Sequence, residues 1–175
     1  MRDHDEGDQT GRVHDPEGVA DILAIQDLVI AYAHAVDDGD WERWEALFLP
    51  DAHIDYTSAG GIAGTPAELA AWMPEALAVF EFCLHSTSTH EIRFTGPTTA
   101  TGRVHVFNRN GVRHQDETEI VDVGAVYEDR YERSGRTWRF ARRVEHTTYI
   151  TGGPFAAAIR DAAAATAANG AAPFG

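Results

Sequence analysis

Hydrophobic residues recur with helical spacing through the first part of the chain. The first apolar stripe runs over 19–36 and predicts an amphipathic helix. Asp15 suits the start of this helix, because it offers a capping side chain and is followed by a proline and an acid. Gly39 suits its end. Residues 1–17 are polar and charged, and we interpret them as a loose N-terminal tail.

Two shorter helices are expected to follow the first. Apolar side chains at helical spacing predict a helix over 40–48, which Pro50 would end. A short strand is expected at 53–56. Thr65 and Glu68 then form a capping box, which predicts the start of a third helix.

From residue 82 onward the hydrophobic pattern has a period of two, which is typical of strands. Turn signals, among them the run 108–111, divide this part into four predicted strands at 82–95, 99–108, 116–132 and 136–150. Helices followed by consecutive hairpin strands are an α+β order. The pattern therefore predicts one α+β domain, with helices first and a long antiparallel sheet after them, around an internal pocket.

The end of the chain, 153–175, is rich in alanine and leaves two interpretations open. It either forms a helix at the mouth of the pocket or frays.

Charge and composition exclude several classes of partner. The 175 residues carry a formal net charge of -14, which disfavours phosphate backbones and anionic membrane surfaces. No apolar run reaches the ~18 residues that a membrane helix needs, and no signal peptide is visible at the start. We therefore expect a cytoplasmic protein that binds neither nucleic acid nor membrane. Cys83 is the single cysteine, so no disulfide forms within the chain.

The common nucleotide, flavin, serine-hydrolase and zinc-protease motifs are absent from the sequence. Nine histidines invite a metal hypothesis. However, His85 and His90 are five residues apart, which places them on opposite faces of a regular strand. The sequence therefore predicts no metal site and no cofactor.

Tyr32 and Asp37 stand at the end of the first predicted helix and are the first candidates for chemistry. They are five residues apart, so they converge only if Asp37 sits in a final, unwinding turn. The helix dipole disfavours an acid at this end. A carboxylate there is either a solvated surface group or one that is kept for function.

Cys83 and His85 share one face of the first long strand, and this face is apolar. A buried histidine is either a satisfied core residue or, with a carboxylate partner, a base suited to proton transfer near neutral pH. On the last strand, parity does not decide between Arg142 and Arg143, since a bulge would exchange the faces.

An ordered set of short motifs carries a resemblance to a known family. It comprises 24–28, Tyr32, Asp37, 48–52, His85, 125–132 and 138–140. Over about 19–152 the chain resembles SnoaL-like proteins, a branch of the nuclear-transport-factor-2-like α+β cone superfamily. The resemblance implies three N-terminal helices packed in a curved mixed or antiparallel sheet, a cystatin-like α+β barrel with a deep pocket. We take 18–152 as this domain.

Three enzymes of the superfamily are most similar in their motifs: bile-acid 7α-dehydratase, scytalone dehydratase and hexachlorocyclohexane dehydrochlorinase. The resemblance implies that Asp37 orients His85, which abstracts a carbon-bound proton, and that Arg143 projects into the pocket. Tyr32 and Tyr56 resemble two pocket tyrosines of the bile-acid enzyme. The dehydrochlorinase has a lysine where Tyr32 stands, which disfavours halide elimination.

The resemblance further implies that Cys83 and Tyr127 line the substrate site. The resulting hypothesis is a cofactor-independent lyase of the dehydratase type, acting on a small hydrophobic cyclic molecule. An isomerase or cyclase using the same dyad, and a non-catalytic small-molecule-binding domain, stay open as alternatives. A homotrimer is expected by resemblance, with a dimer as the alternative.

Overall fold

The computed structural model describes residues 15–114 and 116–170, so most of the predicted tail, 1–14, lies outside the described residues. Two helices come first, α2 (Pro16–Asp37) and α3 (Trp41–Ala46), and α4 (Pro66–Ala76) follows after two strands. Four long strands follow α4, and a last helix, α5, ends the described chain. The remaining elements are β1 (Phe48–Asp55), the 3-10 turn η1 (Thr57–Ala59), β2 (Ala63–Gly64), β3 (Phe80–Gly96), β4 (Thr99–His114), β5 (Glu117–Ser134), β6 (Thr137–Gly152) and α5 (Pro154–Gly170).

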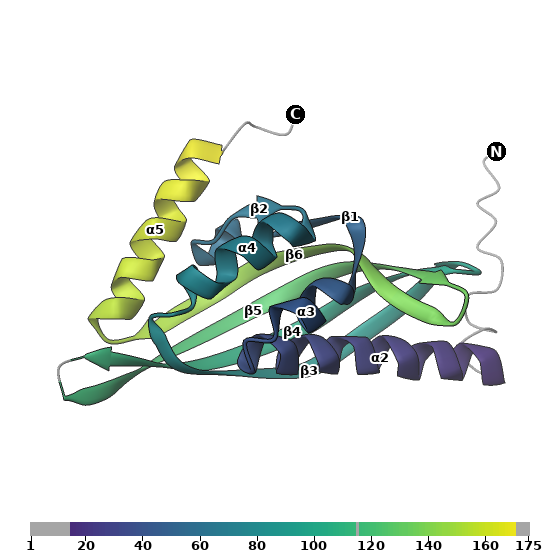
Figure 1. Cartoon of the computed structure of the whole chain (residues 1–175), viewed down its shortest axis with the longest axis horizontal. Helices are drawn as coiled ribbons and strands as arrows, with labels where there is room; N and C mark the ends of the chain where they lie inside the picture. The colour runs from purple at the N-terminus through teal and green to yellow at the C-terminus, as the bar shows by residue number, and fades with distance from the viewer. Residues whose placement is uncertain (1–14, 115, 171–175) are drawn as a thin grey trace, which may run out of the picture.

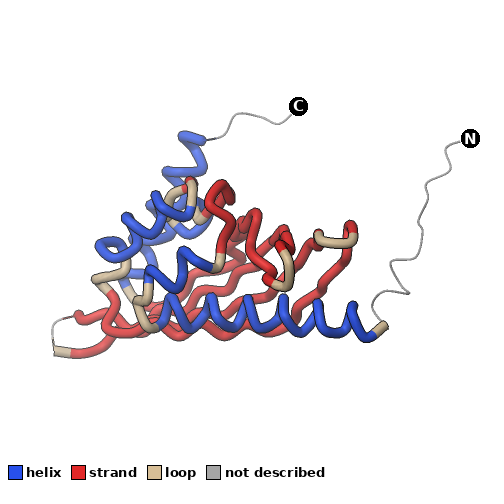
Figure 2. Tube along the Cα trace, turned by 45° about the vertical axis from the view of Figure 1, so that its right-hand side comes forward, coloured by secondary structure: helices blue, strands red, loops and turns tan. Residues whose placement is uncertain are grey.

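The six strands form one mixed sheet in the order β2-β1-β6-β5-β4-β3. β1 runs parallel to β6, and every other neighbouring pair is antiparallel. In Figure 1 α2 runs alongside the long strands, while α4 and α5 lie toward the other end of the sheet. The turned view in Figure 2 shows the same arrangement. The expected α+β class, with helices first and a mixed sheet after, is confirmed.

Local sequence explains the two longest N-terminal helices. The side chain of Asp15 caps α2 by accepting a hydrogen bond from the Gly18 backbone N–H at 2.6 Å. Gly39 follows the helix end with a φ of 66°, a value that costs glycine little. In α4, the capping box of Thr65 and Glu68 forms as predicted.

The apolar face of α2 packs inside the curved sheet. By length and hydropathy α2 could span a membrane, but 44% of its apolar window is buried within the protein. Its packing is that of a core helix. Aromatic rings from α3, β1 and β6 complete the main core around it, with Trp44 and Phe48 at 4.6 Å and Phe48 and Phe140 at 4.9 Å between ring centroids.

A second, smaller apolar cluster lies where α5 meets the sheet. It is built from Val112, Val121, Val123, Ile150 and Ala156. The helical interpretation of the chain end therefore holds for 154–170. The backbone N–H of Phe155 donates to Glu119 at 3.1 Å, and Arg160 Nη1 donates to the Ile150 carbonyl at 2.8 Å. These bonds fix the start of α5 against β5 and β6.

The predicted helix 40–48 is too long. The structure ends α3 at Ala46, and β1 begins at Phe48 and continues through Pro50. Proline is tolerated in this strand because the pairing of β1 with β6 is interrupted between Phe48 and His53.

The turn predicted at 108–111 is wrong, because β4 continues to His114. Gly111 is instead a strand glycine whose missing side chain leaves room for the Phe82 ring, which lies against it. Asn108 and Asn110 alternate with outward-facing residues of the same strand. They therefore point to the inside of the sheet.

Trp138 offers a test of how the start of α2 is attached to the sheet. Its indole N–H donates to Asp21 at 2.7 Å, and both residues are buried. Trp138→Phe leaves the carboxylate without this donor, so we expect a loss of about 1–3 kcal/mol in the free energy of unfolding beyond the loss of ring contacts. Trp44→Phe is the matched control, because the buried indole N–H of Trp44 has no partner among the described residues. Equal losses in denaturant unfolding would refute the role of the bond.

Candidate active site

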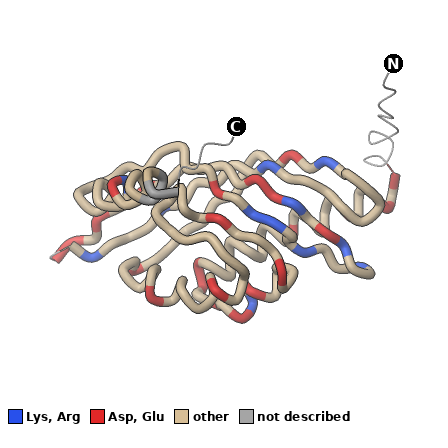
Figure 3. The backbone as a smooth tube through the Cα atoms, turned by 90° about the horizontal axis from the view of Figure 1, so that it is seen from above, with Lys and Arg blue, Asp and Glu red and all other residues tan. Residues whose placement is uncertain are grey.

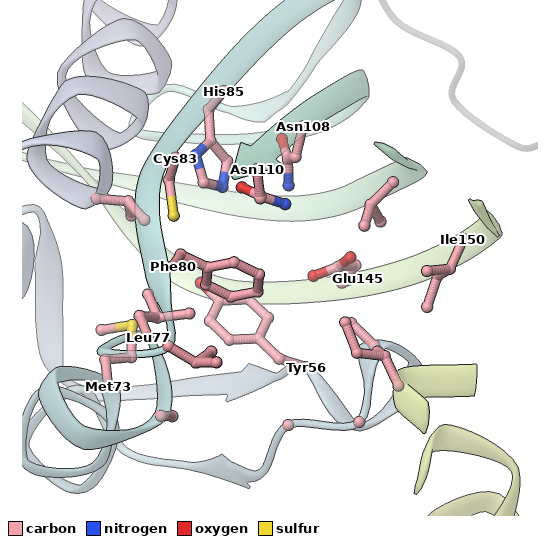
Figure 4. Close-up of a pocket in the computed structure, with 18 of the residues that line it drawn as sticks. Tyr56, Met73, Leu77, Phe80, Cys83, His85, Asn108, Asn110, Glu145 and Ile150 are labelled. Carbon is pink, nitrogen blue, oxygen red and sulfur yellow. The ribbon is translucent and has the colours of Figure 1, made fainter. Parts of the chain in front are cut away.

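An internal cavity of about 260 Å³ lies between the two apolar clusters. Figure 4 shows its walls. Most of the lining is apolar, contributed by α4, β3, β6 and α5, including Met73, Leu77, Phe80, Ile150 and Ile159. Polar groups project into this space from a few positions: Tyr32, Tyr56, His85, Asn108, Asn110, Tyr127 and Glu145.

Asp37 and His85 meet at one wall of the cavity. Asp37 Oδ1 lies 2.6 Å from His85 Nδ1, and the two carboxylate oxygens accept the His85 backbone N–H at 3.1 and 3.0 Å. The side chains are only 16% and 10% exposed. The last residue of α2 thus holds both the backbone and the ring of a residue on β3. With Nδ1 toward the carboxylate, Nε2 is the nitrogen left to face the cavity (Figure 4).

Tyr32 and Tyr56 form a buried hydroxyl pair. Their oxygens are 2.7 Å apart, and both residues line the cavity. Burial raises the pKa of Tyr32 and raises the pKa of Tyr56 well above its ordinary value. Burial has the same effect on the pKa of Tyr127, which also lines the cavity. All three hydroxyls therefore stay protonated and can donate a hydrogen bond.

Arg143, not Arg142, faces the interior. A bulge at Ala141 shifts the register of β6 between the partners of Arg130 and Tyr131, so Phe140 and Arg143 both point inward. Arg143 is fully buried, whereas Arg142 lies beside a depression on the outer face.

Arg143 does not line the cavity as the resemblance implied. Its guanidinium donates two hydrogen bonds to Asp129 at 2.8 and 2.7 Å. Its central carbon lies 4.1 Å from the Tyr32 ring centre and 4.2 Å from that of Tyr127. Burial alone would lower the pKa of Arg143, but the Asp129 carboxylate and the nearby Tyr32 and Tyr56 together raise it well above its ordinary value. The cation therefore stands behind the tyrosines and acts on the cavity through them.

Cys83 lines the cavity next to His85 on β3, as expected. Burial raises the pKa of its thiol to about 11, and the nearby Asp37 adds to this effect. The thiol therefore stays protonated at neutral pH and serves as part of the wall.

Three polar residues of the cavity were missed from the sequence: Asn108, Asn110 and Glu145. Asn108 pairs with His85, and Asn110 with Cys83, across the β3–β4 ladder, so each amide shares the inner face with its partner. The turn predicted at 108–111 conceals that these two asparagines lie on a strand and share its inner face. Glu145 is 7% exposed, and burial raises the pKa of its carboxyl to about 7. The sequence signal that could have found Glu145 is its spacing of two residues from Arg143, which places both on one face of the strand.

His90 does not join His85 in a metal site. The prediction that they lie on opposite faces is wrong, because a bulge between Thr87 and His90 turns both inward. They still diverge, since His90 Nε2 lies 3.2 Å from the Tyr131 hydroxyl while His85 binds Asp37. Within 15–114 and 116–170, no group of three or more His, Cys, Asp and Glu side chains could hold a metal ion.

A second depression lies on the outer face of the sheet, where charged residues of both signs meet. Its lining includes Glu91, Arg93, Arg103, Glu128 and Arg142. Figure 3 shows acidic and basic residues alternating across neighbouring strands. Arg93 and Glu91 pair at 2.6 Å. An exposed ion pair of this kind contributes little to stability.

The fold and the site together define an α+β cone with an apolar internal cavity and an Asp-His pair in its wall. A family model described as "SnoaL-like domain" matches residues 17–144, and the chain belongs to this family.

Curated relatives and solved structures agree with this assignment. An uncharacterized protein of Mycobacterium tuberculosis (strain ATCC 25618 / H37Rv) is 34% identical over 127 residues, which is 73% of this chain and 85% of that protein. The gamma-hexachlorocyclohexane dehydrochlorinase of Sphingobium indicum is 25% identical over 78% of this chain and 86% of its own. The chain is thus a distant relative of known lyases.

The fold is also shared with a solved structure of a candidate scytalone dehydratase from Novosphingobium aromaticivorans DSM 12444. The TM-score is 0.67, with 24% identity over 76% of this chain and 87% of that one. The arrangement is the cystatin-like fold.

Glu145 makes the stability of the protein depend on pH in a defined direction. Its carboxyl has an ordinary pKa of 4.5 and a folded-state pKa of about 7, so the folded state binds the proton more tightly. Its contribution is complete below the ordinary value and is lost as the pH rises through about 7. Relative to Glu145→Gln, the wild-type free energy of unfolding should fall by about 3 kcal/mol between about pH 4 and about pH 8. Parallel curves from denaturant titrations would contradict the raised pKa.

Proposed function

We propose that the protein is a cofactor-independent lyase of the dehydratase type. His85 abstracts a carbon-bound proton from a small hydrophobic cyclic substrate, and a hydroxyl group leaves from the neighbouring carbon. The kinship with lyases supports the reaction class. The observation that carries the proposal is the 2.6 Å contact between Asp37 Oδ1 and His85 Nδ1 beside the cavity.

The contact assigns a role to each partner of the dyad. When the Nδ1–H group donates a hydrogen bond to Asp37, Nε2 has no proton. Its lone pair then faces the substrate and can accept a proton. The carboxylate then stabilises the imidazolium that forms. Since it also accepts the His85 backbone N–H, the ring is held in place before the substrate arrives.

The tyrosine pair supplies stabilisation for the charge that develops on the substrate. Abstraction of a proton next to a carbonyl group leaves an enolate oxygen. One hydroxyl of the Tyr32–Tyr56 pair donates to the other, and the second hydroxyl is then suited to donate to the enolate. The buried cation of Arg143 lies against the Tyr32 ring at 4.1 Å and polarises it toward donation. In this proposal Arg143 is a positioning residue.

The apolar lining defines the substrate class. Met73, Leu77, Phe80, Ile150 and Ile159 would contact a hydrophobic body, while the polar groups would orient its oxygens. A compact cyclic ketone with a hydroxyl group next to the acidic carbon fits both requirements.

His85→Gln and Asp37→Asn test the dyad directly. Because a positioned base contributes about 10²–10⁴-fold to rate, we expect losses of this order in kcat/KM for His85→Gln. Asp37→Asn should also lower kcat, since it favours the wrong tautomer. The assay follows formation of the conjugated enone from cyclic β-hydroxy ketones by ultraviolet absorbance.

His146→Gln is the matched control, because His146 is exposed on the outer face and pairs with the exposed Glu128. Mass spectrometry distinguishes the reactions, since dehydration loses one water and isomerisation leaves the mass unchanged. Full activity of the His85→Gln variant would refute the dyad mechanism.

We also propose that the protein self-associates, as a trimer or a dimer, through the outer face of the sheet. Exposed apolar side chains gather there on four neighbouring strands: Phe82, Leu84, Phe107, Ile120 and Tyr149. Two of the rings lie against glycines of the adjacent strand, which flattens the surface. The Arg109–Asp122 ion pair lies on the same face among them. Exposed apolar side chains gathered on one face in this way are typical of protein interfaces.

Leu84→Glu tests this surface. Leu84 is 53% exposed, so the change leaves the core intact and places a charge in the patch. We expect the mass measured by light scattering after gel filtration to fall to that of a monomer. Leu23→Glu, which alters a comparably exposed leucine on α2, should leave the mass unchanged. A monomeric wild type would contradict the proposal.

A further inference from the structure

The Asp37–His85 dyad explains how a proton is removed from carbon. It does not explain how the hydroxyl group departs from the neighbouring carbon. Hydroxide is a poor leaving group, so its oxygen needs a proton as the carbon–oxygen bond breaks. The dyad and the tyrosine pair do not supply that proton. Among the cavity residues, Glu145 has no part in the steps above, although its side chain faces the cavity (Figure 4).

The backbone at Glu145 is held in place by a residue of the η1 turn. Ser58 Oγ donates to the Glu145 carbonyl at 2.7 Å, and the Thr147 N–H donates to Ser58 Oγ at 3.0 Å. Beyond these bonds a bulge at Thr148 shifts the strand, so that Glu145 and Ile150 both line the cavity despite their odd spacing. The side chain is therefore aimed at the cavity by a fixed stretch of β6.

The carboxyl group itself is nearly without partners. Among the described residues, one hydrogen bond reaches it, from Thr147 Oγ1 at 3.4 Å. The cation two positions away, Arg143, directs its two side-chain hydrogen bonds to Asp129, and none of the described hydrogen bonds joins it to Glu145. A buried carboxyl without an ion-pair partner keeps its proton more readily than an exposed one. The physical situation is that of a carboxylic acid held ready to donate.

The groups around Glu145 favour the same protonation state. The titratable side chains that face it across the cavity are the hydroxyls of Tyr32, Tyr56 and Tyr127, the thiol of Cys83, and His85. The tyrosines and the thiol stay neutral at neutral pH, so apart from Arg143 none brings a positive charge that would favour the carboxylate. In the proposed mechanism His85 gains a positive charge when it takes the substrate's proton.

Asn108 indicates what kind of molecule occupies this end of the cavity. Its Oδ1 is buried and accepts no hydrogen bond from the described residues. The amide nitrogen of Asn108 points into the cavity instead (Figure 4), where it can donate a hydrogen bond to a ligand oxygen. The cavity therefore offers donors from both Asn108 and Glu145, which suit a ligand that carries oxygen atoms.

We propose that Glu145 is the general acid of the reaction and protonates the leaving hydroxyl of a cyclic β-hydroxy ketone. The inference rests on the proposed lyase function. His85 Nε2 takes the proton from carbon, and the electron pair of that bond forms the carbon–carbon double bond. The carbon–oxygen bond breaks, its pair goes to oxygen, and oxygen takes the Glu145 proton. Water leaves, and transfer of the proton from His85 to Glu145 through solvent restores both groups.

The test separates proton abstraction from leaving-group protonation by using three probes. Cyclohexanone in D2O reports abstraction alone, through deuterium uptake next to the carbonyl. 3-Hydroxycyclohexanone and 3-acetoxycyclohexanone form the same cyclohexenone, but acetate leaves without a proton donor. For Glu145→Gln we expect water loss to fall about 10²–10⁴-fold, while acetate loss and deuterium uptake are retained.

The pH profile and two variants complete the experiment. Wild-type water loss should decline above about pH 7, where Glu145 ionises, and acetate loss should lack this limb. Glu145→Asp should recover part of the water loss, since it restores the acid. Glu128→Gln, the same change at an exposed position on β5, should behave as wild type.

Each result has a distinct meaning. Undiminished water loss by Glu145→Gln overturns the assignment of Glu145 and leaves the dyad intact. Equal loss of all three activities in that variant also overturns it, because it shows a general structural role. If His85→Gln retains deuterium uptake, the proposed function itself fails.

Discussion

The carboxylate of Asp37 ties the end of the longest N-terminal helix to the first long strand. It accepts a hydrogen bond from the backbone N–H of His85, and its Oδ1 also contacts Nδ1 of the His85 ring. A negative charge at a helix C-terminus opposes the helix dipole, at a cost of roughly 0.3–1 kcal/mol. The hydrogen bond from the His85 backbone N–H and the contact with the His85 ring offset this cost. The same carboxylate therefore attaches α2 to β3 and orients the imidazole. Fold and site therefore depend on one junction.

A second polar network lies deeper in the cone and leaves the cavity apolar. Asp129 accepts bonds from Arg143 and from the Tyr131 hydroxyl, and that hydroxyl also contacts His90. The network uses the Nε and Nη2 donors of the guanidinium, leaving Nη1 unpaired among the described atoms. A buried ion pair contributes little net stability after desolvation. Its effect here is to fix a cation behind the tyrosine rings while keeping it off the cavity wall.

Much of the fold could be predicted from the sequence because its signals are local. Caps at Asp15 and Thr65 and a change of period near residue 82 depend on neighbouring residues only. The pairing of Asp37 with His85 came from the order of motifs shared with a family. What failed depends on long-range pairing: Gly111 is used to seat a ring, not to turn the chain.

β-Bulges are the second reason why the inward-facing residues of β6 could not be predicted from the sequence. One extra residue at Ala141, and another at Thr148, change which side chains of β6 face inward, and no local pattern marks either position. They decide that Arg143 is inside and that Glu145 and Ile150 share a wall. Glu145 was passed over because an isolated acid on a strand has no motif.

The helix α5 lies outside the region that defines the family, which ends at residue 144, yet Phe155, Ile159 and Ala162 form part of the cavity wall. The dyad and the tyrosines belong to the matched region, whereas the far wall is added by the following segment. Change in α5 can therefore reshape the binding space without disturbing Asp37 or His85. In such an architecture ligand preference can diverge independently of the dyad, so kinship over the matched region predicts proton abstraction by a homologue better than its substrate or its leaving group, since Glu145 lies beyond that region.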